Sequence, residues 1–224
     1  MPLPSVLFIH EAGGGSWEWC VWENIFRQNQ FQTYAINLEA ADKGLEHTTS
    51  ADYLNQTKRF AERHQLITPV MVGVGMGGML ALRFAQESQP KAIVLINPLG
   101  PQAWIGEELT IPPVVIPWRN EDREWLDDMP SSHPRDEIQE RRESGAVLKD
   151  LYLKQTTPSV TCPCMVLIGE QHNVAPPETG NELADALNAQ VIAYKGTDAI
   201  AALLGFEAKA IARQVCAELK LLEA

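Results

Sequence analysis

The sequence lacks any apolar run that approaches the roughly 20 residues needed to cross a membrane. It is also poor in positive charge, with 18 Lys and Arg against 29 Asp and Glu and a net charge of -11. A chain of this charge repels the phosphates of nucleic acids and of anionic membranes. The first residues contain no basic segment and no cleavage signal. We therefore predict a cytoplasmic protein that binds neither nucleic acid nor membrane.

Cysteine is scarce. The Cys162-Pro163-Cys164 spacing matches neither a zinc knuckle nor a redox pair, and Cys20 and Cys216 stand alone. We interpret all four as small buried apolar residues. Binding of a metal by His172, Asp198 and Glu11 is conceivable, but no ligand spacing supports it. We predict no metal and no cofactor.

Short apolar runs alternate with helical patterns along the chain, which favours an α/β fold with a mostly parallel sheet of about six strands flanked by helices. Its 224 residues suit one domain, 1–224. The predicted strands are Val6–His10, Thr33–Asn37, Val70–Val74, Lys91–Ile96, Met165–Ile168 and Val191–Tyr194. The predicted helices are Glu18–Gln28, Ala51–Arg63, Met76–Gln86, Glu178–Leu187 and a closing helical region, Ala199–Leu222.

The alternation stops in a proline-rich and charged segment at about residues 98–162. A structureless loop of this length would be unusual in a compact domain. We therefore expect a helical lid inserted into the domain, with helices near Glu121–Asp128 and Arg135–Lys154.

A serine is missing where the glycine pattern predicts one. In the Gly-x-Ser-x-Gly nucleophile elbow, a serine on a sharp strand-to-helix turn presents its hydroxyl above a parallel sheet. Here Gly73, Gly75 and Gly77 keep the frame, but Gly75 stands at the position of the nucleophile. Since glycine tolerates positive φ, we expect the loss of the serine to relieve strain and open a small void.

Three segments together resemble the α/β-hydrolase superfamily: His10-Glu11-Ala12-Gly13-Gly14-Gly15 after the first strand, the glycine frame, and Gly169-Glu170-Gln171-His172 after a late strand. The chain looks most like the compact branch of methylesterases and hydroxynitrile lyases. The resemblance implies a sheet without the family's first two strands, and a lid over the site.

The resemblance also implies where a catalytic triad would lie, and the expected residue types are missing there. The nucleophile position falls on Gly75, the acid position on His172 and the base position on Asp198. Because no histidine follows residue 172, no later imidazole can serve as the base. The oxyanion hole consists of backbone, so the N–H groups of Ala12 and Met76 should persist.

Four further residues are predicted to line the pocket: His10, Glu11, Trp17 and Asn97. Glu11 replaces a glycine of the family, and it either opposes a bound anion or turns outward to pair with a base. His10 is better explained as a structural hydrogen-bonding residue than as a catalytic one. Trp17 either packs on the sheet or touches a ligand.

Three functions remain open. The first is a non-hydrolytic protein that binds a small, partly apolar molecule. The second is an enzyme that uses the same pocket: a lyase, cyclase or isomerase with His172, Asp198 and Glu11 as proton carriers, or a hydrolase of small esters by a non-standard mechanism. The third is an interaction scaffold with a vestigial pocket. The sequence also leaves a homo-oligomer open.

Overall fold

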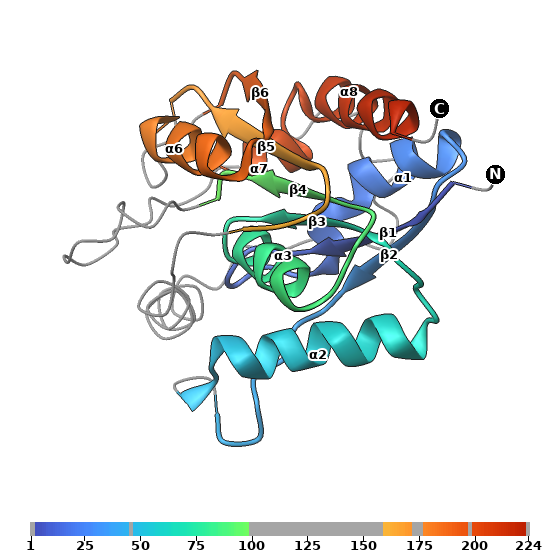
Figure 1. The fold of residues 1–224 in the computed structure, drawn as a ribbon, viewed down its shortest axis with the longest axis vertical. Helices are drawn as coiled ribbons and strands as arrows, with labels where there is room; N and C mark the ends of the chain where they lie inside the picture. The colour runs from blue at the N-terminus through green and yellow to red at the C-terminus, as the bar shows by residue number, and fades with distance from the viewer. Residues whose placement is uncertain (1–2, 45–46, 99–158, 172–176, 197–198, 223–224) are drawn as a thin grey trace.

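The computed structural model describes residues 3–44, 47–98, 159–171, 177–196 and 199–222. In this part of the chain six strands form one sheet in the order β2-β1-β3-β4-β5-β6, and every neighbouring pair is parallel (Figure 1). The strands are β1 (Ser5–Ile9), β2 (Gln32–Ile36), β3 (Val70–Val74), β4 (Ala92–Ile96), β5 (Cys164–Gly169) and β6 (Gln190–Tyr194). The predicted α/β architecture is confirmed.

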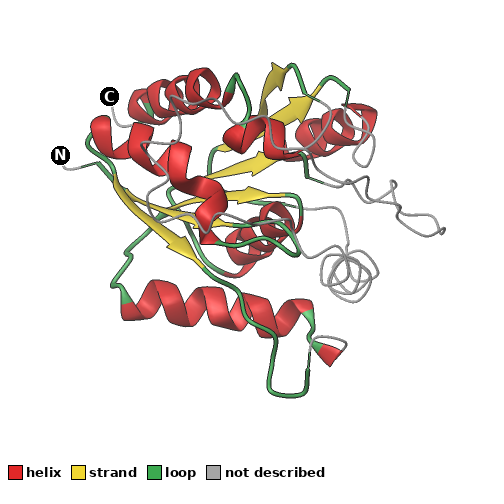
Figure 2. Ribbon diagram, turned by 180° about the vertical axis from the view of Figure 1, so that it is seen from behind, coloured by secondary structure: helices red, strands yellow, loops and turns green. Residues whose placement is uncertain are grey.

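Helices cover both faces of the sheet. They are the short 3-10 helix η1 (Ser16–Trp19), α1 (Cys20–Gln28), α2 (Ser50–Arg63), α3 (Met76–Glu87), α6 (Pro177–Leu187), α7 (Ala199–Leu204) and α8 (Ala208–Leu221). In Figure 1, α1 and α8 lie on one side of the sheet, and α2 and α3 lie on the other. Figure 2 shows the same layers from behind, with the two termini on the same side of the molecule.

Each face of the sheet has its own apolar core, because successive side chains of a strand point to opposite faces. Val70, Val72 and Val74 pack with α1, α7 and α8, whereas Met71 packs with α2, α3 and α6. All five residues of β3 are buried, as expected for a central parallel strand covered on both sides.

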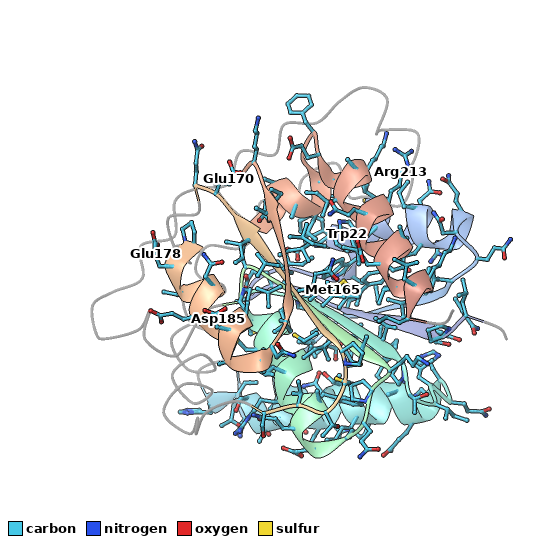
Figure 3. The ribbon with its side chains drawn as sticks, turned by 45° about the horizontal axis from the view of Figure 1, so that its top comes forward. Trp22, Met165, Glu170, Glu178, Asp185 and Arg213 are labelled. Atoms are coloured by element: carbon cyan, nitrogen blue, oxygen red, sulfur yellow. The ribbon has the colours of Figure 1, made fainter. Side chains whose placement is uncertain are left out.

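The core on the α1 side is rich in aromatic residues. Phe8 stacks on Trp19 with ring centroids 4.8 Å apart, and the indole Nε1 of Trp22 donates to the carbonyl of Ala202 over 2.9 Å. In Figure 3, Trp22 and Met165 lie in the interior, and Glu178 and Asp185 lie on the outside of α6. The hydrogen bond from Trp22 to Ala202 fixes α1 against α7.

Two predicted helices differ from the structure. The helix expected over Glu18–Gln28 begins as the 3-10 turn η1 and becomes α-helical only at Cys20. The region expected over Ala199–Leu222 splits into α7 and α8 at Gly205, where a side chain would lie 2.4 Å from the carbonyl oxygen of Ala201.

The predicted lid and its two helices fall almost wholly on residues 99–158, which lie outside the described residues. Of the helices in the described ranges, none combines the length and apolarity that a membrane span needs.

Candidate functional site

Gly75 forms the sharp turn between β3 and α3 that the sequence predicts. Its φ of 48° and ψ of -112° lie in a region that strains residues with a side chain. Its N–H donates to the carbonyl of Ile96 over 2.9 Å, and its carbonyl accepts from the N–H of Met79. The turn places residue 75 at the carboxyl edge of the sheet, where ligands bind in open α/β folds.

The two outer glycines of the frame allow α3 to approach the sheet closely. A Cβ on Gly73 would lie 2.2 Å from the carbonyl oxygen of Gly77, and a Cβ on Gly77 would lie 2.2 Å from that of Ile9. Both neighbours are backbone atoms, which cannot turn aside. The frame therefore retains the geometry of an elbow although its centre has no side chain.

The carboxylate of Glu11 turns toward the elbow. Its Oε1 accepts from the N–H of Ala12 over 2.9 Å and from the N–H of Met76 over 2.8 Å. These are the two N–H groups that the sequence predicts for an oxyanion hole, and we call them the donor pair. Glu11 therefore faces inward and does not turn outward.

The same carboxylate occupies the space that a side chain on Gly75 would need. A Cβ built on Gly75 would lie 1.4 Å from Oε2 of Glu11 and 2.2 Å from its carboxyl carbon. The expectation of a small void at this position was wrong. A carboxylate from a loop 64 residues earlier in the sequence fills it.

The loop of residues 10–15 is held by further hydrogen bonds around Glu11. The N–H of Glu11 donates to Oε2 of Glu18 over 3.2 Å, and its carbonyl accepts from the N–H of Gly14 over 3.0 Å. Glu18 is completely buried, and a side chain on Gly14 would lie 2.1 Å from Oε1 of Glu18. Gly14 thus leaves the room in which Glu18 supports the loop.

His10 has the structural role that its sequence context favours. Its Nε2 accepts from the N–H of Leu38 over 2.9 Å, so the proton lies on Nδ1, which donates to the carbonyl of Glu11 over 2.7 Å. The side chain is 2% exposed. Both ring nitrogens are engaged with backbone, and they tie the loop after β1 to the end of β2.

Asn97 lies at the end of β4 and joins three strand ends. Its Oδ1 accepts from the N–H of Gly169 over 2.8 Å, and its Nδ2 donates to the hydroxyl of Tyr194. It is 4% exposed and has a φ of 42°.

Trp17 is half-buried and packs against the core on the α1 side. Asn97 therefore holds strand ends together by hydrogen bonds, whereas Trp17 contributes to the apolar core.

Two predicted triad positions, His172 and Asp198, lie outside the described residues. Within the described residues no group of three His, Cys, Asp or Glu is placed to hold a metal ion.

Two surface hollows of about 470 and 440 Å³ lie along α2. Neither of these two hollows is lined by Glu11 or Gly75.

Sequence reasoning missed Glu18 and Tyr194. A lone Glu near the start of a helix gives no signal that its carboxylate is fully buried. The only hint was the run of glycines before it, which gives a side chain room to enter the loop.

A family model described as "Alpha/beta hydrolase family" matches residues 6–204. No curated protein sequence matches the chain. Solved structures share its fold. The chain is 15% identical to MGS-MChE2, an alpha/beta hydrolase enzyme from a sediment metagenome of the lagoon of Mar Chica, Morocco, with a TM-score of 0.69 over 97% of this chain and 92% of that one.

Two further structures come from named organisms. The monoacylglycerol lipase of Paleococcus ferrophilus is 16% identical, with a TM-score of 0.71 over 99% of this chain and 97% of that one. The RedJ thioesterase of the prodiginine pathway of Streptomyces coelicolor is 16% identical, with a TM-score of 0.63 over 99% and 90%. At these identities the likeness shows the fold alone.

Proposed function

The chain belongs to the alpha/beta hydrolase family, and we propose that it is a member without serine-hydrolase chemistry that binds a small, partly apolar molecule at the carboxyl edge of its sheet. The observation that carries this proposal is the position of the Glu11 carboxylate. It accepts hydrogen bonds from both members of the donor pair and fills the place of the nucleophile's side chain.

The chemistry of ester hydrolysis supports the proposal. The reaction needs an oxygen nucleophile activated by a base that is itself oriented by a third group. Gly75 supplies no oxygen, and no histidine follows residue 172. Loss of triad members lowers the rate by several orders of magnitude.

The occupied donor pair is a second obstacle. The oxyanion of a tetrahedral intermediate needs the N–H groups that Glu11 already engages. If the Glu11 carboxylate stayed about 4 Å from the oxyanion, the two negative charges would repel each other by about 4 kcal/mol at an effective dielectric constant of about 20. Glu11 therefore acts against this intermediate.

One observation favours a second candidate, an enzyme in which Glu11 carries protons or attacks the substrate. Its carboxylate lies where the family places its reactive side chain, and it is oriented by two backbone N–H groups. The structural neighbours named as lipase and thioesterase also favour hydrolase activity. This candidate predicts turnover that depends on the carboxylate itself.

Ester turnover distinguishes these proposals. We would measure hydrolysis of p-nitrophenyl acetate by wild type, Gly75→Ser, Glu11→Gln and Ala12→Pro, with circular dichroism to check folding. We expect no turnover above the buffer rate from any of them. Wild-type turnover that is lost in Glu11→Gln would support the enzyme and contradict our proposal. Turnover lost only in Ala12→Pro would indicate a nucleophile elsewhere and would also contradict it.

Binding needs its own assay. We would screen small aromatic amines, alcohols and carboxylates for an increase in the melting temperature of wild-type protein. A saturable increase with at least one compound is the expected result. If no compound raised the melting temperature, the interaction scaffold with a vestigial pocket would replace our proposal.

A further inference from the structure

We propose that the larger of the two hollows along α2 is a second binding site, and that it takes a zwitterionic ligand with a carboxylate at one end and an ammonium group at the other. The hollow has a volume of about 470 Å³, which is within the range of small-molecule sites. Its walls are α2, the last residue of β2 and the loop after that strand. Since neither Glu11 nor Gly75 lines it, this inference does not depend on the proposed function.

The chain that leaves β2 runs beside α2 in the opposite direction. Near the carboxyl end of the helix, the rings of Tyr34 and His64 have centroids 5.2 Å apart. In the middle of the helix, the side-chain amide of Gln56 accepts from the N–H of Glu39 over 3.0 Å and donates to its carbonyl over 2.7 Å. Residues 35–38 therefore lie beside the last turns of α2, whereas the loop from Glu39 onward lies beside its first half.

The carboxyl-terminal half of α2 gives the hollow a cationic end. Arg59 and Arg63 both line the hollow, and their spacing of four residues places them on the same face of the helix. The segment beside them, residues 35–38, contains no acidic residue. In the part of the chain that the structure describes, neither guanidinium group forms an ion pair. Two guanidinium groups on one helix face can bind a carboxylate through charge-assisted hydrogen bonds.

The loop after β2 gives the hollow an anionic end. Glu39 and Asp42 line this end and are exposed, and among the described residues neither forms an ion pair. Asp52 also lines the hollow, but its carboxylate is paired with Lys43 over 2.7 Å and accepts hydrogen bonds from Thr49. The carboxylates of Glu39 and Asp42 are thus the groups that can bind an ammonium group, which supplies three donors and the opposite charge.

The distance between the two ends selects the length of the ligand. Glu39 lies level with Gln56. Arg59 and Arg63 follow Gln56 by about 5 and about 10 Å along the helix axis, at a rise of about 1.5 Å per residue. A ligand with a single charge would be attracted at one end of the hollow and repelled at the other. A short flexible chain with opposite charges at its two ends satisfies both.

Three probes of similar length but different charge test the proposal: 6-aminohexanoate, hexanoate and hexylammonium. We would titrate each into isotope-labelled protein at pH 7 and follow the backbone amide signals by NMR, which measures weak binding and also locates it. Low salt is used because it screens exposed charges least. The test variants are the double substitutions Arg59→Gln/Arg63→Gln and Glu39→Gln/Asp42→Asn.

Two further double variants are matched controls, because each removes two charges of one sign from exposed positions away from the hollow. Arg213→Gln/Lys195→Gln removes two positive charges, and Glu178→Gln/Glu182→Gln removes two negative charges that are four residues apart on α6. Figure 3 shows Arg213 on α8 and Glu178 on α6. Circular dichroism checks that all variants are folded.

Wild type and both controls should bind 6-aminohexanoate about fivefold more tightly than either singly charged probe, which is the upper range for one exposed ion pair. The largest signal changes should fall in residues 36–42 and 52–63. The arginine variant should bind 6-aminohexanoate no more tightly than hexylammonium, because the carboxylate has lost its partners. The acidic variant should bind 6-aminohexanoate no more tightly than hexanoate, because the ammonium group has lost its partners.

Two results would overturn the proposal. One is wild-type protein that does not bind 6-aminohexanoate, or that binds all three probes equally. The other is a preference for 6-aminohexanoate that survives in either test variant, because the ligand would then bind elsewhere. Ester turnover by wild type would contradict the proposed function at the elbow and would leave this second site unaffected.

Discussion

Glu11 and Gly75 form a complementary pair: the carboxylate of one occupies the space left by the missing side chain of the other. The site where a Cβ of residue 75 would lie is 1.4 Å from Oε2 of Glu11. The carboxylate reaches this position because Ala12 and Met76 donate to its other oxygen. The effect of a substitution at one residue on the free energy of unfolding should therefore depend on which residue occupies the other position.

The first prediction is an energetic coupling between these two residues. Gly75→Ser should lower the free energy of unfolding by about 2–4 kcal/mol, because it expels the carboxylate from its hydrogen bonds and strains the backbone. The melting temperature should fall by roughly 5–15 °C. In a Glu11→Gly background the additional loss should be smaller, since only the strain remains. Urea unfolding of wild type, Gly75→Ser, Glu11→Gly and the double variant measures the coupling.

Gly77→Ala is the control for this cycle. Its Cβ would meet the backbone carbonyls of Ile9 and His10 rather than a side chain that can move. Its cost should be the same with and without Glu11. Fully additive effects of Gly75→Ser and Glu11→Gly would contradict the coupling.

The second prediction concerns the buried amide of Asn97. Asn97→Ala should cost about 2–4 kcal/mol, because it leaves the N–H of Gly169 and the hydroxyl of Tyr194 without this partner. Tyr194→Phe removes only the second of these contacts and should cost less. The exposed Asn181 on α6 offers a control, Asn181→Ala, which should cost under about 0.5 kcal/mol. Equal losses for both asparagines would refute a structural role for Asn97.

The third prediction concerns pH. The hydrogen bond from Lys43 and those from Thr49, which form the capping box of α2, lower the pKa of Asp52 from 3.8 to about 2. The stabilisation by its ionised form is complete above about pH 4 and is lost as the pH falls through about 2. Carboxyl NMR should show Asp52 titrating near pH 2, and Lys43→Met should raise that midpoint. A midpoint unaffected by Lys43→Met would disprove that Lys43 is the main cause of the lowered pKa.

The fourth prediction concerns the thiols. Burial raises the pKa of Cys164 and of Cys216 to about 12 each, so at pH 8 only about one in ten thousand of either is ionised. Cys164 and Cys216 are buried as expected, but the expectation was wrong for Cys20 and Cys162, which are half-buried. A chromogenic disulfide reagent should modify at most Cys20 and Cys162 in the native protein at pH 8, and all four thiols after unfolding. The native count should not change in Cys164→Ala. More than two rapidly modified thiols would show that the native core is open.

Sequence pattern predicted the strands and the elbow well because both depend on local properties. The bounds of β3 match the expectation of Val70–Val74, since a central parallel strand reads as one continuous apolar run. The ends of two helices were predicted less accurately than the strands. The break at Gly205 depends on a close approach between backbones, which leaves little trace in the periodicity.

Apolar periodicity and residue identity are properties of the chain alone, so they were enough to establish the α/β alternation, the glycine frame and the absence of a serine at residue 75. Which group fills the space beside Gly75 depends instead on contacts between segments that are distant in the sequence. Glu11 and Met76 are far apart in the sequence, and no local rule states whether a half-exposed carboxylate turns inward or outward. Only the parallel pairing of β1 with β3 brings the donor pair together on one oxygen and puts the carboxylate in the space beside Gly75.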